Sequence, residues 1–203
     1  MDGSCHFSTN FKYCWILNKL SKIIYYLTGM DGRLETGLGQ ALLSKGLDVT
    51  GSELTGEFRQ LRFQGQVDAV ASDLQSGFWN TDARVIANSF GAYLFLHAQA
   101  QLPPYPGKVI LLSPIVGEFV NQETEMNFIP PRSEHLLAVA NTGSYPAPLN
   151  CEIHVGSLDW QSNPTNVEMF GALTGLKVTV VPEAGHMLPK EYVNNLLVRW
   201  LEA

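Results

Sequence analysis

Short apolar segments alternate along this chain with segments of helical periodicity, and this alternation limits the possible fold more than any other feature. The apolar segments are rich in β-branched and aliphatic residues, and they span residues 22–29, 84–89, 108–117, 151–159 and 177–186. Apolar residues recur at helical spacing in residues 37–46, 67–79, 90–102, 133–141, 164–175 and 190–203. Strands that are apolar on both faces are typical of parallel sheets covered by helices on both sides. The sequence therefore predicts an α/β fold: a single domain with a mostly parallel sheet and helices on both faces.

The N-terminal residues and one long connection do not fit the repeating pattern. Residues 1–21 match neither periodicity, so we expect an N-terminal arm followed by the α/β domain at residues 22–203. Lysines interrupt the apolar residues of this arm, which argues against a signal peptide and against a membrane span. Residues 118–150 are longer than one connection between strands needs, and we expect them to form a small flap above the sheet edge.

Charge and cysteine content exclude several classes of function. The 203 residues carry a net charge of −6 without any cluster of lysine or arginine, which argues against a nucleic-acid partner. The three cysteines, Cys5, Cys14 and Cys151, are too scattered for a disulfide framework or a metal site, and they favour a reducing, cytoplasmic location. The segment GLGQAL at residues 37–42 lacks the third glycine of a dinucleotide-binding turn and does not directly follow a strand. We therefore expect neither a metal nor a cofactor.

Ser89 lies where an apolar strand passes into a helix, in the segment ANSFG at residues 87–91. Ligands bind at the carboxyl ends of parallel strands, so this position is suited to a reactive group. A serine on a tight turn from strand to helix needs small residues two positions away on each side, as in the Gly-x-Ser-x-Gly nucleophile elbow. Ala87 in place of the first glycine weakens the pattern. Serine is also a favoured N-cap, so this segment alone leaves both roles open.

Two further residues make the nucleophile the better interpretation. Asp159 and His186 each come just after a predicted strand, and the chain order Ser, Asp, His is the order used on this type of sheet. A serine hydroxyl is a weak nucleophile until a base takes its proton. We therefore predict Ser89 as the nucleophile, His186 as the general base, and Asp159 as the carboxylate that orients the imidazole.

Three segments, ANSFGA, GSLDWQSNP and EAGHMLP, resemble the nucleophile, acid and histidine segments of the α/β-hydrolase family in a compact form with a minimal cap. The resemblance covers about residues 22–203 and implies the α/β-hydrolase fold with Ser-His-Asp chemistry. Some relatives carry the acid after the preceding strand, so Glu118 is an alternative to Asp159. We favour Asp159. The GMDG turn resembles turns of some family members, so Met30 is expected to complete the oxyanion hole with the amide of Phe90.

These residues predict a serine hydrolase that cleaves a small carboxylic ester or thioester through an acyl-enzyme. An acyltransferase or biosynthetic thioesterase would use the same residues, and a non-catalytic binding protein could retain the fold. The serine at position 89 argues against a dehalogenase, which would need aspartate there. Side chains that either line the acyl pocket or belong to the core are Trp79, Phe119, Phe128, Trp160 and Met187, and Arg132 is expected to face solvent. Acyl length, leaving group and oligomeric state are not fixed by the sequence.

Overall fold

The computed structural model describes residues 23–121 and 126–202, and within these ranges six parallel strands form the main sheet in the order β2-β1-β3-β4-β7-β8. Its strands are β1 (Ile23–Met30), β2 (Asp48–Leu54), β3 (Arg84–Asn88), β4 (Lys108–Leu112), β7 (Asn150–Gly156) and β8 (Lys177–Val181). The helices are α2 (Gly37–Ser44), α3 (Gly56–Gln60), α4 (Phe63–Gly77), α5 (Phe90–Gln99), α6 (His135–Asn141), α7 (Pro164–Thr174) and α8 (Lys190–Glu202). The predicted parallel α/β fold is confirmed.

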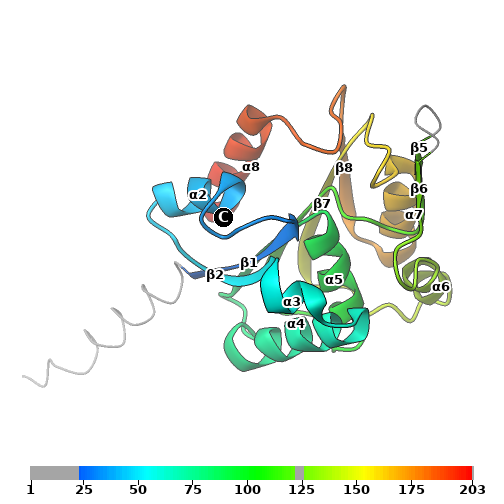
Figure 1. The fold of residues 1–203 in the computed structure, drawn as a ribbon, viewed down its shortest axis with the longest axis horizontal. Helices are drawn as coiled ribbons and strands as arrows, with labels where there is room; N and C mark the ends of the chain where they lie inside the picture. The colour runs from blue at the N-terminus through cyan, green and yellow to red at the C-terminus, as the bar shows by residue number, and fades with distance from the viewer. Residues whose placement is uncertain (1–22, 122–125, 203) are drawn as a thin grey trace, which may run out of the picture.

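Helices cover both faces of this sheet (Figure 1). On one face, α2 and α8 bury Leu42, Leu197 and Trp200 against alternate strand residues such as Ile24 and Ile86. On the other face, α4, α5, α6 and α7 pack over the neighbouring residues of the same strands. The central strands β3 and β4 are therefore apolar on both sides, which explains why their sequences lack polar alternation.

The strands end earlier than the sequence predicts. The segments 108–117, 151–159 and 177–186 were each expected to be strand throughout, but β4, β7 and β8 end at Leu112, Gly156 and Val181. These predictions were wrong because the chain bends away at the carboxyl edge: Ser113 and Glu183 both have positive φ, at 44° and 56°. The residues after each bend form the loops that build the candidate site.

Strand β2 was not predicted. It lies at the edge of the main sheet beside β1, and its residues are mostly exposed or half-buried. An edge strand has one neighbouring strand and little apolar surface to bury, so its sequence gives a weak signal. Gly51 is required here, because a Cβ at this position would lie 2.1 Å from the backbone oxygen of Tyr26.

The connection predicted as a flap contains an antiparallel pair, β5 (Phe119–Asn121) and β6 (Met126–Phe128), followed by α6. The predicted arm at residues 1–21, with Cys5 and Cys14, lies outside the described residues. In the part of the chain that the structure describes, no helix has the length and apolar character needed to cross a membrane.

Candidate active site

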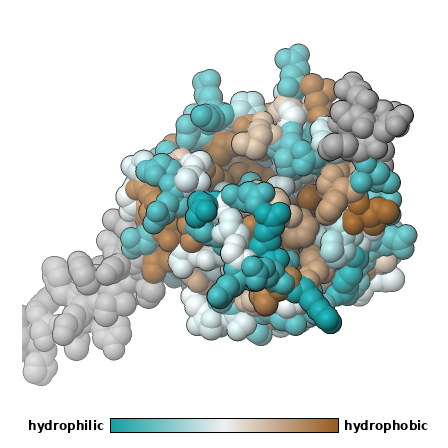
Figure 2. Space-filling view, in the orientation of Figure 1, coloured by the Kyte–Doolittle hydropathy of each residue, from teal (hydrophilic) through white to brown (hydrophobic). Residues whose placement is uncertain are grey.

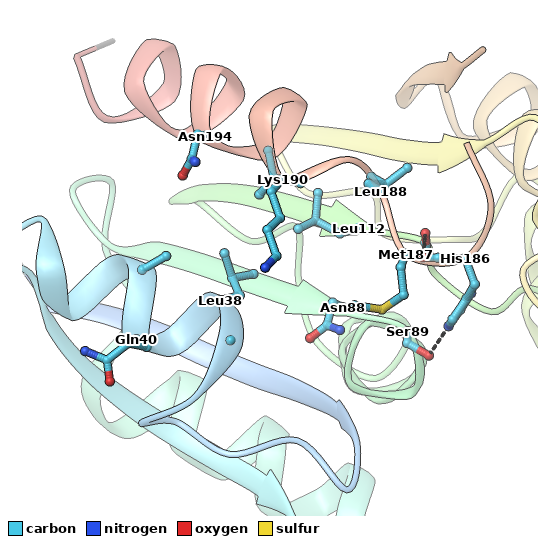
Figure 3. Close-up of a pocket in the computed structure, with 14 residues that line it drawn as sticks. Leu38, Gln40, Asn88, Ser89, Leu112, His186, Met187, Leu188, Lys190 and Asn194 are labelled. Atoms are coloured by element: carbon cyan, nitrogen blue, oxygen red, sulfur yellow. Dashed lines mark hydrogen bonds between the residues drawn. The ribbon is translucent and has the colours of Figure 1, made fainter. Parts of the chain in front are cut away.

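Ser89 occupies the bend between β3 and α5. Its backbone has φ 53° and ψ −122°, a conformation that a residue with a side chain adopts at a cost, and its amide donates to the Leu112 carbonyl over 2.9 Å. The Ser89 side chain makes no hydrogen bond to the first turn of α5, so it does not cap the helix. The strained backbone instead aims the hydroxyl away from the helix, toward His186 (Figure 3).

Small residues around Ser89 let α5 begin directly against β1. A Cβ on Gly91 would lie 2.3 Å from the Thr28 carbonyl oxygen, and one on Gly29 would lie 3.3 Å from the Ser89 Cβ. Ala87 is fully buried and its methyl group belongs to the core on the α4–α5 face, so alanine fits where the common elbow pattern has glycine. The tight strand-to-helix turn therefore forms with alanine, instead of glycine, at position 87.

His186 lies in the loop after β8, between Ser89 and Asp159. Its Nε2 is 2.8 Å from Ser89 Oγ, and its Nδ1 is 3.0 Å from each carboxylate oxygen of Asp159. The Ser113 hydroxyl donates to the His186 carbonyl over 2.9 Å, which ties this loop to the end of β4. The three residues predicted from the sequence thus form one continuous series of hydrogen-bond distances.

Asp159 is buried and held from its own loop. Its Oδ1 accepts hydrogen bonds from the amides of Gln161 (3.0 Å) and Ser162 (2.9 Å). Burial raises the pKa of Asp159, but the hydrogen bond and charge of His186 and the Ser162 amide outweigh burial and leave the pKa below its ordinary value. The side chain is therefore an ionised carboxylate at neutral pH. The alternative acid, Glu118, is exposed just before β5.

Ser113 and Ser162 were not predicted as parts of this site. The Ser162 hydroxyl donates to the Ser113 carbonyl over 2.6 Å and also lies 3.4 Å from His186 Nδ1. The Ser113 amide donates in turn to the His154 carbonyl of β7 over 2.7 Å. The sequence offered no signal for Ser113, because it lies inside the segment 108–117 that is predicted to be strand throughout, whereas β4 ends at Leu112.

Met30 and Phe90, the predicted oxyanion-hole residues, end β1 and begin α5, and both line a cavity of about 370 Å³. Asn88 connects the two elements: its Oδ1 accepts from the Gly29 amide (3.0 Å) and the Tyr26 hydroxyl (2.9 Å). This contact holds Gly29, the residue before Met30, beside Asn88, the residue before Ser89. The contribution of Asn88 was not predicted.

A second cavity, of about 400 Å³, lies between α2 and α8 and opens onto Ser89 and His186. Figure 2 shows hydrophobic surface in a hollow beside these helices, and Figure 3 shows Met187 pointing toward Asn88 and Ser89. Of the side chains considered for the acyl pocket, Met187 lines this cavity and Phe128 lines the one beside Met30. The others make aromatic contacts: Trp79 with Tyr105, and Phe119 with both Phe128 and Trp160.

The remaining candidates lie away from Ser89. Arg132 is exposed and donates to Gln64 over 2.8 Å. His97 is buried between Phe63 and Tyr93, and among the described residues no group of three His, Cys, Asp or Glu side chains could hold a metal ion.

Comparison with known proteins gives matches in structure but not in sequence. No protein-family model and no curated protein sequence matches this chain. A YdeN-like protein from Pectobacterium atrosepticum has a TM-score of 0.62 at 18% identity, covering 94% of this chain and 97% of its own. A protein of the alpha/beta hydrolase superfamily from Xanthomonas campestris has a TM-score of 0.58 at 14% identity, with 90% and 96% covered. The chain has the α/β-hydrolase fold.

The resemblance noted from three short segments is thus confirmed as a likeness of fold. A carboxylesterase from the thaumarchaeon Nitrososphaera gargenis also matches, with a TM-score of 0.58 at 14% identity, covering 89% of this chain and 90% of its own. At such identities an α/β-hydrolase fold does not by itself specify a reaction, because one fold supports many activities. The reaction has to be argued from the side chains at the carboxyl edge of the sheet.

Proposed function

We propose that this protein is a serine hydrolase that cleaves small carboxylic esters or thioesters through an acyl-enzyme. The observation that carries the proposal is the position of His186, with one ring nitrogen 2.8 Å from the Ser89 hydroxyl and the other 3.0 Å from the Asp159 carboxylate. A buried carboxylate, an imidazole and a hydroxyl in this series are the groups needed to make serine nucleophilic at neutral pH. The carboxylesterase among the structural matches supports an ester substrate.

In the proposed mechanism, His186 Nε2 takes the proton of Ser89 as Oγ attacks the carbonyl carbon. Asp159 keeps the Nδ1 proton in place and stabilises the imidazolium that forms. The negative oxygen of the tetrahedral intermediate accepts hydrogen bonds from the backbone amides of Phe90 and Met30. His186 then protonates the leaving group, and a water molecule activated by the same imidazole releases the acid and regenerates Ser89.

Hydrolysis of p-nitrophenyl esters and acyl thioesters of graded length tests this proposal. We expect turnover by the unmodified protein, and losses of about 10⁴- to 10⁶-fold in Ser89→Ala and His186→Ala. Ser76→Ala is the matched control, because Ser76 is exposed on α4 and its hydroxyl donates to the Asp73 carbonyl of the same helix. Equal turnover by the unmodified and Ser89→Ala proteins would contradict the proposal, as would absence of turnover across both substrate series. Acyl transfer to an added alcohol or thiol in preference to water would identify an acyltransferase.

A further inference from the structure

The cavity between α2 and α8 has apolar walls and one permanently charged side chain. Its walls are made largely by aliphatic and thioether side chains, namely Leu38, Ala41, Leu112, Met187, Leu188 and Val193. Gln40 and Asn194 add neutral polar groups, and among the described residues no aspartate or glutamate contributes to the lining. Lys190 is therefore the permanent charge that a bound molecule meets in the described lining of this cavity.

Lys190 has no charged partner among the residues that the structure describes. It is the first residue of α8, and its side chain extends across the cavity toward Leu38 of α2 (Figure 3). Among the residues that the structure describes, no carboxylate lies within 4.0 Å of its ammonium group. A cation at a helix N-terminus is also unfavourable to the helix, so Lys190 does not stabilise α8 through its charge.

The positive charge of Lys190 is opposite in sign to the net charge of the protein. The protein carries 19 acidic and 13 basic residues, so its overall field repels anions. The ammonium group of Lys190 at this apolar cavity instead attracts anions locally. A carbon chain can occupy the walls, and a carboxylate on that chain can pair with Lys190 while the ester lies at Ser89.

We propose that the substrates of this site are esters or thioesters that carry a carboxylate on the arm occupying the α2–α8 cavity, and that Lys190 selects them. The inference rests on the proposed function for its reaction and adds the class of substrate. Both arms of an ester are attached to the carbonyl carbon that Ser89 attacks, so the carboxylate belongs either to the acyl chain or to the leaving group. Two pairs of substrates separate these sources.

The first pair is mono-p-nitrophenyl adipate and p-nitrophenyl hexanoate, which have six acyl carbons each and differ by a carboxylate on the acyl chain. The second pair is 3-carboxyphenyl hexanoate and phenyl hexanoate, which differ by a carboxylate on the leaving group. The measured quantity is the ratio of kcat/KM for the anionic ester to that for the neutral ester, after subtraction of the rate with Ser89→Ala protein. In Lys190→Gln, we expect this ratio to fall about fivefold in one pair, the upper end for an exposed ion pair.

Two variants control for the charge itself. Lys190→Arg keeps the cation and should retain most of the ratio. Lys45→Gln removes the same charge at the opposite end of α2, where the side chain is exposed and outside the cavity, and it should leave both ratios within about twofold. The inference would be overturned if Lys190→Gln left the ratio unchanged for both substrate pairs while Ser89-dependent turnover stayed intact. That result would leave the proposed function standing.

A binding measurement tests a carboxylate on the acyl chain without any turnover. In the Ser89→Ala background, titration followed by ligand-observed NMR compares monomethyl adipate, which is anionic, with dimethyl adipate, which is neutral. We expect Lys190→Gln to raise the Kd of the anion about fivefold relative to the neutral diester, and added salt to reduce the difference. Equal effects on the two ligands, together with an unchanged ratio in the second substrate pair, would overturn the proposal. If the unmodified protein showed no Ser89-dependent turnover but the expected binding difference was observed, the proposed hydrolysis would be rejected and the anion site would be supported.

Discussion

Replacing Asp159 with asparagine removes one negative charge and almost no volume, so it tests the role of the carboxylate with little change in shape. The asparagine oxygen can still accept from the amides of Gln161 and Ser162, which keeps the loop in place. Its NH₂ group would face His186 Nδ1 and favour the imidazole tautomer with the proton on Nε2. That tautomer cannot take a proton from Ser89.

The size of the effect follows from the geometry. The imidazolium that forms during reaction lies 3.0 Å from a buried carboxylate. At an effective dielectric constant of about 20, opposite unit charges about 3 Å apart attract by roughly 5.5 kcal/mol. Because each 1.36 kcal/mol in a barrier is about a factor of ten in rate, we expect kcat to fall about 10⁴-fold in Asp159→Asn.

The assay is p-nitrophenyl ester hydrolysis near neutral pH, with thermal unfolding as a check that the variant is folded. Glu118→Gln is the matched control, since it makes the same chemical change on an exposed carboxylate and should keep activity within about twofold. A folded Asp159→Asn protein that retains more than a tenth of the activity would refute this reasoning. A larger loss in Glu118→Gln would assign the acid to Glu118.

Two further predictions concern stability. Gly91→Ala places a methyl group 2.3 Å from the Thr28 carbonyl oxygen, which cannot move aside as a side chain would, so we expect a loss of about 3 kcal/mol and a clearly lower Tm. Gly65→Ala on α4 has its nearest contact at 3.7 Å and should be neutral or stabilising, and equal Tm values for the two variants would contradict this account. Burial, with the nearby charges of His135 and Arg132, lowers the pKa of His97 to about 3, and both of its ring nitrogens lack hydrogen-bond partners among the described residues. The unfolded chain therefore binds a proton below about pH 6.5 that the folded protein does not, which costs about 2 kcal/mol at pH 5. Urea unfolding at pH 5 and pH 8 should show this loss reduced in His97→Leu, and an undiminished loss would rule out His97 as its source.

The main layers of the fold could be predicted from the sequence because the central strands are buried on both faces. β3 and β4 have nearly all-apolar sequences, which leave few alternatives to a parallel sheet between helices. The edge strand β2 could not be predicted, since its sequence DVTGSEL is half exposed and contains a glycine that a close approach to Tyr26 requires. Local sequence gives little indication of a strand that is stabilised mainly by its neighbour.

The convergence of the three proposed catalytic residues could be predicted from the sequence, whereas the lining of the cavity could not. Ser89, Asp159 and His186 each follow a strand, so their approximate convergence depends on topology alone. Lys190 and Leu38 belong to helices on either side of the α2–α8 cavity, and which side chains enter it depends on how those helices pack. Trp79 and Met187 illustrate the limit: both adjoin predicted site segments, but Trp79 packs against Tyr105 and Met187 lines the cavity.

The central claim is that the Ser89 hydroxyl is made nucleophilic by His186, and a fluorophosphonate probe tests it most directly. Such probes form a stable bond with an activated serine, and mass spectrometry of the digested protein locates the modified residue. The account predicts labelling on the peptide that contains Ser89, at a rate reduced by orders of magnitude in His186→Ala. Labelling at other serines only, or equal labelling of Ser89 with and without His186, would contradict it.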